Sequence, residues 1–255
     1  MIIYSFDCAM KNLGFCCIEI DDKWREKTAE LLDVIEKFYA NPPETKESIQ
    51  TEMLNIFRTA DSIVTNQFVI KYINVFDLIP NGKAKSQKFG DTLQCLKYVV
   101  YCLEKQLPNP DVVLIEYQMN VNDKARGISR YIEEHFTPIG IRGGESSITN
   151  ITYALNKFPL IAADIPEDQC ECTVHIVAPG LKNRYNIDSA AVYTGFLEKY
   201  SSNYAANKAH AVHHFKYFLN KFGLSDMIKD CPNKLDDLAD AFMMAYAWSK
   251  KNKLI

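Results

Sequence analysis

The chain has 255 residues, a hydrophobic content of 47% and a formal net charge of −3. This hydrophobic content is enough for a large buried core, and the length suits one large domain. There is no run of 18 apolar residues, and the N-terminus lacks the zones of a signal peptide, so we expect an intracellular protein. The eight cysteines form no C-x-x-C pair, which indicates buried thiols in a reducing compartment.

The acidic residues are unevenly distributed along the chain. The segment from Glu19 to Glu52 contains ten acidic and five basic residues, so the rest of the chain has a net charge of +2. A negative net charge argues against a nucleic-acid partner, because phosphate binding depends on lysine and arginine. The uneven distribution nevertheless leaves room for a basic face outside the acidic segment.

The first third of the sequence predicts an antiparallel meander with helices inside it. Residues 2–8 and 13–20 have the composition of strands and are separated by a short turn, which predicts a β-hairpin. Apolar residues at helical spacing then predict an acidic helical insertion at about 25–66. Residues 68–79 alternate between apolar and polar side chains, as a third strand would, and a basic loop follows at 80–88.

The rest of the sequence alternates helices with buried strands. Residues 91–107 predict an amphipathic helix. The following DVVLIEYQ has four consecutive apolar residues before Glu116, which is typical of a strand buried on both faces of a parallel sheet. A second helix is expected at 124–136 and a second buried strand at 172–179. The chain ends in two predicted helices, at about 208–221 and 236–250.

This order of elements is that of the ribonuclease H-like fold. We therefore expect an α/β protein with a mixed five-stranded sheet, helices on both faces, and the acidic helical insertion between the second and third strands. Residues 1–255 are expected to form a single domain. Because a fold alone does not determine function, the chemistry must be argued from particular side chains.

Carboxylates occupy positions at which the pattern predicts apolar residues. Asp7 lies in the first strand, and Glu116 lies at the carboxyl end of a later strand, where ligands of open α/β sheets usually bind. The apolar final helix contains Asp236, Asp237 and Asp240, of which the last two lie one turn apart on one face. Each acid alone could be structural, since Asp236 and Asp237 also suit the helix dipole. Together they favour a site for two Mg²⁺ or Mn²⁺ ions, because isolated buried carboxylates are costly.

Four motifs occur in order along the chain: SFDCAMKNLGF, LIEYQ followed by NDKARGISRYIEEHF, NKAHAVHHF, and KLDDLADAF. Together they resemble the Holliday junction resolvases of poxviruses and other large DNA viruses, relatives of the bacterial RuvC-like enzymes. The resemblance covers most of the chain outside about 25–66. It implies a Mg²⁺-dependent, structure-selective endonuclease that resolves four-way DNA junctions by paired symmetric nicks. It also implies a homodimer, nicks that leave 5′ phosphates, and action at a site of viral DNA replication, in cytoplasm or nucleus.

The resemblance implies roles for particular residues. The metal-binding catalytic acids would be Asp7, Glu116, Asp237 and Asp240. Two ions would bind in each active site, and Asp236 remains an alternative to Asp237. Lys208, which the pattern places at the start of a helix, would lie beside the scissile phosphate. Independently of the resemblance, the small residues Ala9 and Gly14 are expected to leave room for a phosphate near Asp7.

Basic residues in three places are expected to contact DNA phosphates. They are Lys83 and Lys85 in the loop after the third strand, Lys124, Arg126 and Arg130 on the next-but-one helix, and Lys182 and Arg184 after the fifth strand. Gln118, two residues beyond Glu116, points to the same side and could contact the substrate or a metal-bound water.

Two other functions remain open, and a third is disfavoured. Another nuclease of this fold, acting on flaps or RNA–DNA hybrids, would use the same acids. A junction-binding protein that has lost its activity would bind without turnover, although all four acids are present. An actin-like phosphotransferase would need glycine-rich phosphate loops, and only ten glycines are spread along the chain.

Overall fold

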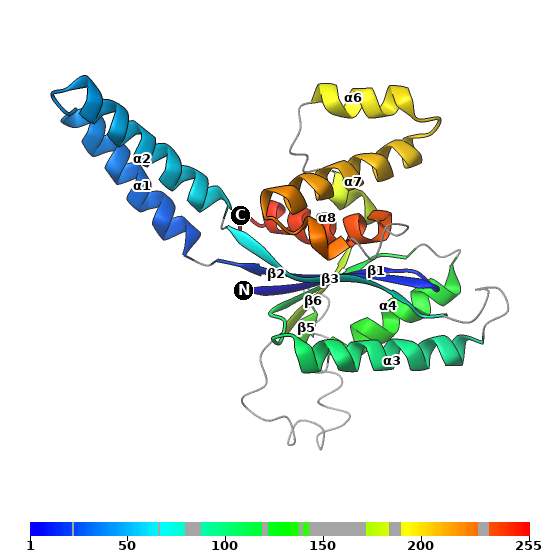
Figure 1. Ribbon diagram of the computed structural model, residues 1–255. Helices are drawn as coiled ribbons and strands as arrows, with labels where there is room; N and C mark the ends of the chain where they lie inside the picture. The colour runs from blue at the N-terminus through cyan, green and yellow to red at the C-terminus, as the bar shows by residue number, and fades with distance from the viewer. Residues whose placement is uncertain are drawn as a thin grey trace, which may run out of the picture.

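The computed structural model describes residues 1–21, 23–65, 67–79, 88–118, 122–137, 140–142, 172–183, 190–228 and 235–255. These residues form one mixed sheet covered by helices, with a pair of helices extending from one end (Figure 1). None of the helices in the described ranges is long and apolar enough to cross a membrane.

Six strands form the sheet, in the order β3-β2-β1-β4-β6-β5. They are β1 (Ile2–Cys8), β2 (Asn12–Ile20), β3 (Phe68–Asp77), β4 (Val112–Glu116), β5 (Gly140–Arg142) and β6 (Cys172–Val177). The first three pair antiparallel, which confirms the predicted meander, and the other pairings are parallel. Five of the strands, in the order β3-β2-β1-β4-β6, form the mixed sheet of the ribonuclease H-like fold. The prediction of five strands missed β5, because a three-residue strand is too short to show a periodic pattern.

Helices cover both faces of the sheet (Figure 1). On one face lie α3 (Phe89–Gln106) and α4 (Asp123–Phe136), and on the other lie α7 (Asn203–Lys221) and α8 (Leu235–Lys251). Alternate residues of β1 point to opposite layers: Phe6 packs in the α3–α4 core, whereas Ile3 packs in the α7–α8 core. The sheet therefore separates two buried cores. The six described cysteines are free thiols, four of them buried.

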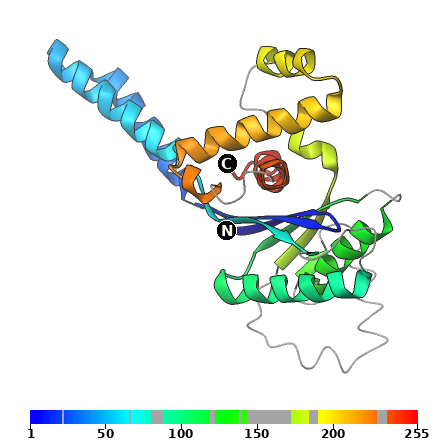
Figure 2. The same cartoon turned by 45° about the vertical axis from the view of Figure 1, so that its right-hand side comes forward.

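The C-terminal third differs from the prediction in two places. Helix α7 begins at Asn203 and not at 208, because the Ser202 hydroxyl caps it by accepting a hydrogen bond from the Ala205 N–H at 3.2 Å. Helix α6 (Ala190–Lys199) was not predicted, since it is short and the residues at its centre, 192–196, are weak helix formers. It lies over α7 on the side away from the sheet (Figure 2). Two 3₁₀ helices complete the described elements, η1 (Pro179–Asn183) and η2 (Ser225–Ile228).

Two helices, α1 (Trp24–Ala40) and α2 (Lys46–Thr65), connect β2 to β3 and project away from the sheet (Figure 1). Helix α1 has no buried residue. The β2–β3 pairing continues to the base of these helices, where Ile20 is opposite Phe68. The sheet therefore does not depend on the two helices for its register.

Candidate active site

Three elements bring four carboxylates to one cavity. Asp7 lies near the end of β1, and Glu116 ends the neighbouring parallel strand β4. Asp237 and Asp240 come from the first turns of α8, and all four acids line a cavity of about 420 Å³. Asp236 lines a neighbouring cavity instead. The structure thus brings together the four acids that the sequence pattern singled out.

Small residues let α8 approach the sheet closely. The Ser5 hydroxyl of β1 donates a hydrogen bond to the Ala241 carbonyl of α8 at 2.8 Å. A Cβ atom on Gly14 of β2 would lie only 2.5 Å from the Asp237 carbonyl oxygen. Gly14 therefore makes room for the acidic start of α8, and the expectation that it leaves room for a phosphate is wrong. Ala9, by contrast, does line the carboxylate cavity.

A lysine lies inside the carboxylate cluster. Lys182 of η1 contacts Glu116 Oε1 at 3.0 Å and Asp240 Oδ2 at 2.6 Å, and none of the three side chains is more than 15% exposed. The sequence predicted a DNA phosphate contact for Lys182. In the structure its ammonium pairs with these carboxylates, because buried acids require a nearby positive charge.

The surroundings of these acids shift their pKa values in different directions. Burial raises the pKa of Asp7 well above its ordinary value, and the hydrogen bond and negative charge of Glu116 raise it further. Burial also opposes ionisation of Glu116, but the hydrogen bond from Asp7 and the charge of Lys182 hold the pKa of Glu116 below its ordinary value. Burial raises the pKa of Asp240 despite the Lys182 ammonium. The cluster therefore contains more carboxylates than one lysine neutralises.

A second lysine, Lys208, lies at the edge of the same cavity. Because α7 begins at Asn203, Lys208 is on its second turn, and the prediction that it opens the helix is wrong. Its Nζ donates to Asp236 Oδ2 at 2.6 Å and lies 5.5 Å from the centroid of the Tyr204 ring. Asp236 thus orients Lys208 and does not itself join the four carboxylates.

The other predicted DNA contacts are only partly within the described residues. Lys124, Arg126 and Arg130 are on α4, and the two arginines line a cavity of about 510 Å³ that also includes Glu116 and Gln118. Gln118 lines the carboxylate cavity as well, so the two cavities are adjacent. The remaining three predicted contacts, Lys83, Lys85 and Arg184, lie outside the described residues.

The oxygen atoms of the four acids are ligands that suit a hard divalent cation. The available ligands are carboxylate oxygens, which Mg²⁺ and Mn²⁺ prefer. In the arrangement of the described part of the chain, no three acidic, histidine or cysteine side chains are close enough to hold an ion. A cation would compete with Lys182 for Glu116 and Asp240, which this lysine now contacts.

The residues of the cavity that were not identified from the sequence include Tyr117, Tyr204 and Asn207. Tyr204 precedes Lys208 by one helical turn on the same face of α7, so a correct helix start would have indicated it. Tyr117 and Asn207 have no signal of their own beyond their position next to Glu116 and Lys208.

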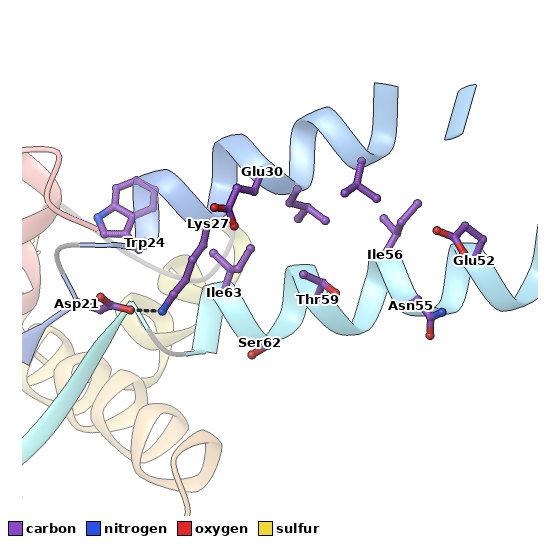
Figure 3. A pocket seen from close by; sticks show the side chains of 12 residues that line it. Asp21, Trp24, Lys27, Glu30, Glu52, Asn55, Ile56, Thr59, Ser62 and Ile63 are labelled. Carbon is purple, nitrogen blue, oxygen red and sulfur yellow. Dashed lines mark hydrogen bonds and ion pairs between the residues drawn. The ribbon is translucent and has the colours of Figure 1, made fainter. Parts of the chain in front are cut away.

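A separate cavity of about 360 Å³ lies between α1 and α2 (Figure 3). Its charged lining consists of Asp21, Glu30 and Glu52 with one lysine, Lys27, which pairs with Asp21 at 2.5 Å. This negative lining argues against an anionic ligand between the two helices.

Comparison with known proteins gives one family match. Residues 187–252 match the family model described as "Poxvirus A22 protein". The resemblance to this poxvirus family is confirmed over these residues, which make up less than half of the chain. The segment that matches the poxvirus family contains Lys208, Asp237 and Asp240, whereas Asp7 and Glu116 lie outside it. No curated protein matches the chain significantly.

Several solved structures are similar to the chain. The crystal structure of the fowlpox virus Holliday junction resolvase is 14% identical, with a TM-score of 0.43 and coverage of 99% of both chains. The yeast mitochondrial Holliday junction resolvase Ydc2 is 12% identical, with a TM-score of 0.48 over 99% of this chain and 80% of that chain. RuvC of T. thermophilus, in complex with a Holliday junction substrate, is 11% identical, with a TM-score of 0.40 over 100% and 96%. Similarities this distant assign no role to any residue of the chain.

Proposed function

We propose that the protein is a Mg²⁺-dependent, structure-selective DNA endonuclease that resolves four-way junctions by paired symmetric nicks. The observation that carries the proposal is the convergence of Asp7, Glu116, Asp237 and Asp240 in one cavity, from two central strands and one helix. A purely structural role would not require four acids around one cavity, because buried carboxylates are costly unless they are paired. The poxvirus family match over 187–252 supports the same reaction.

In the proposed reaction, a water oxygen forms a bond to phosphorus while the bond between phosphorus and the 3′ oxygen breaks. The water gives up a proton and the leaving 3′ oxygen takes one up, so the products are a 5′ phosphate and a 3′ hydroxyl. Two Mg²⁺ or Mn²⁺ ions, when bound, would activate the water and stabilise the charge on the leaving oxygen. The four acids would hold these ions. Lys208 and Lys182 would neutralise charge on the phosphate, and Asp236 would keep Lys208 in position.

The proposal includes the organisation of the molecule. One domain, residues 1–255, would carry the active site, with α1 and α2 as a helical insertion at about 25–66. A homodimer would place two active sites on one junction, because two symmetric nicks require two sites. Two of the similar structures are resolvases described with Holliday junction DNA. Lys124, Arg126 and Arg130 of α4 would contact the DNA backbone, and the enzyme would act at a site of viral DNA replication.

A direct test is cleavage of a labelled four-way junction in Mg²⁺ by the wild type and by Asp7→Asn. We expect Asp7→Asn to lose nicking and to keep junction binding in Mg²⁺-free buffer, since it removes one metal ligand and no phosphate contact. Asp33→Asn on α1, where Asp33 is 59% exposed, is a matched control that should nick like the wild type. Undiminished nicking by Asp7→Asn would overturn the proposal.

The same assay distinguishes the alternative functions. A flap and an RNA–DNA hybrid are offered beside the four-way junction under identical conditions. Faster cleavage of the flap or the hybrid would identify a different nuclease of this fold. Tight junction binding without turnover in Mg²⁺ or Mn²⁺ would identify a junction-binding protein without activity.

A further inference from the structure

A fourth cavity, of about 560 Å³, lies between α6 and α7 beside the carboxylate cavity. We call it the α6–α7 groove. Its lining includes Phe196, Tyr200, Tyr204, Lys208, His213 and Lys216. Helix α6 covers α7 on the side away from the sheet, so the groove lies outside both buried cores (Figure 2). Of these residues, only Lys208 has a part in the proposed reaction.

The groove is adjacent to the carboxylate cavity. Tyr204 and Lys208 line both cavities. Asp236 also lines the groove and accepts the hydrogen bond from Lys208 at 2.6 Å. A DNA strand whose phosphate lies beside Lys208 would therefore have its neighbouring nucleotides at the groove.

The groove offers aromatic ring faces. Tyr204 is 70% exposed. The rings of Phe196 and Tyr200 are stacked, with centroids 6.3 Å apart and an interplanar angle of 14°. Aromatic side chains of this kind stack with nucleobases whatever the sequence, because every base has a π face. The groove can therefore hold bases that are not already stacked on one another.

The groove also carries positive charge. Lys208 and Lys216 line it against a single acid, Asp236, which already pairs with Lys208. The cavity between α1 and α2 has the opposite balance, with three acids and one lysine in its lining. Of these two cavities, only the α6–α7 groove is electrostatically suited to a polyanion.

We propose that the α6–α7 groove binds a single, unpaired DNA strand at the branch point of the junction. The proposal rests on the proposed resolvase function. It identifies the surface that binds the DNA strand beyond the active site. A base inside a duplex has both faces covered by its neighbours, so only an unstacked segment can pack against Tyr204 and Tyr200. Lys216 would contact the backbone of the same strand, as in other grooves that combine aromatic and basic side chains.

The test measures binding of fluorescein-labelled oligothymidylate in Mg²⁺-free buffer. Tyr204→Ala and Tyr200→Ala should each weaken binding about tenfold, whereas Tyr204→Phe should keep it, because stacking requires the ring and not the hydroxyl. Tyr98→Ala on α3, where Tyr98 is 70% exposed, and Tyr217→Ala on α7, outside the groove, are the matched controls. Both should bind like the wild type.

A second measurement locates the strand directly. A four-way junction with 5-iodouracil at the branch point is irradiated with the protein, and crosslinks to peptides containing Tyr200 or Tyr204 would support the proposal. Two results would overturn the groove proposal alone, provided that the wild type nicks junctions. One is crosslinking confined to other peptides, and the other is unchanged oligothymidylate binding by both alanine variants. The wild type could also fail to nick junctions while Tyr204→Ala still weakens oligothymidylate binding. That result would overturn the resolvase function and keep the groove as a DNA-binding site.

Discussion

Lys182 provides the positive charge inside a cluster of buried carboxylates. Burial by itself lowers the pKa of this lysine, but Asp240, Glu116 and Asp7 together raise it well above its ordinary value. The ammonium therefore stays charged at neutral pH. Removing one member of such a buried pair leaves an uncompensated charge, which destabilises a protein more than the pair itself stabilises it.

Lys182→Met should therefore lower the free energy of unfolding by about 3 kcal/mol in Mg²⁺-free buffer. Asp240→Asn removes one of the carboxylates that Lys182→Met leaves unpaired, so the double variant should be more stable than the sum of the two changes predicts. Urea unfolding of the wild type, both single variants and the double variant measures this coupling. Additivity within about 0.5 kcal/mol would show that the two side chains do not interact energetically.

Gly14 is the position at which an added methyl group would disturb α8 most directly. Gly14→Ala should lower the free energy of unfolding by about 1–3 kcal/mol and slow nicking, because its Cβ would push against the Asp237 backbone. Gly90→Ala is the control, since a Cβ there meets nothing within 4 Å. Thermal unfolding and junction cleavage are measured for both. If Gly14→Ala matched Gly90→Ala in both assays, the close approach of α8 to β2 would be disproved.

At the scale of elements, α1 and α2 stand apart from the sheet that they interrupt. Helix α1 contributes no buried residue, and large apolar side chains of the pair face solvent, including Tyr39 at 78% and Phe57 at 65% exposure. The strands on either side are already paired at the base, where the Asp21 N–H donates to the Gln67 carbonyl at 3.0 Å. The two helices therefore add little to the stability of the sheet and the helices that cover it.

Replacing residues 23–65 by a short Asn-Gly turn should accordingly leave a folded protein. The turn would join β2 and β3 in their present antiparallel register, for which such turns are well suited. Circular dichroism and junction cleavage should show retained secondary structure and retained nicking. A variant of this kind that is soluble but unfolded would mean that the helices are needed for the sheet to form.

At the scale of the whole molecule, the acidic segment is separated from the carboxylate cavity. The acidic segment from Glu19 to Glu52 lies largely in α1 and α2, which project away from the sheet (Figure 1). Asp7 and Glu116, which line the carboxylate cavity, lie at the carboxyl ends of β1 and β4. The net charge of +2 outside the acidic segment is compatible with DNA binding there. The overall charge of −3 is thus a poor guide to the partner of the active site.

The proposed homodimer can be tested through mixed dimers. Wild-type protein is mixed and refolded with an excess of tagged Asp7→Asn protein, and dimers with one tag are purified. Such dimers should cut a cruciform plasmid in one strand and yield a nicked circle, because only one of their active sites is intact. Linear product at the wild-type yield would show that one active site makes both cuts.

Much of the fold could be predicted because its signals are local. The four-residue apolar run before Glu116 and the alternation at 68–79 follow directly from which faces of each strand are buried. Helix α8 was predicted at 236–250 and observed at Leu235–Lys251. The strand β5 and the helix α6 were missed, because elements this short show no clear periodic pattern.

The sequence by itself determined the order of the longer strands and helices and marked Asp7, Glu116 and Asp240 as acids in apolar surroundings, because both follow from side-chain periodicity along one segment. Only the tertiary structure decided that Asp237 lines the carboxylate cavity while Asp236 pairs with Lys208. It also decided that Lys182 enters the carboxylate cluster. These outcomes depend on how α8, α7 and η1 pack onto the sheet. Such contacts between distant segments leave no periodic trace in the sequence.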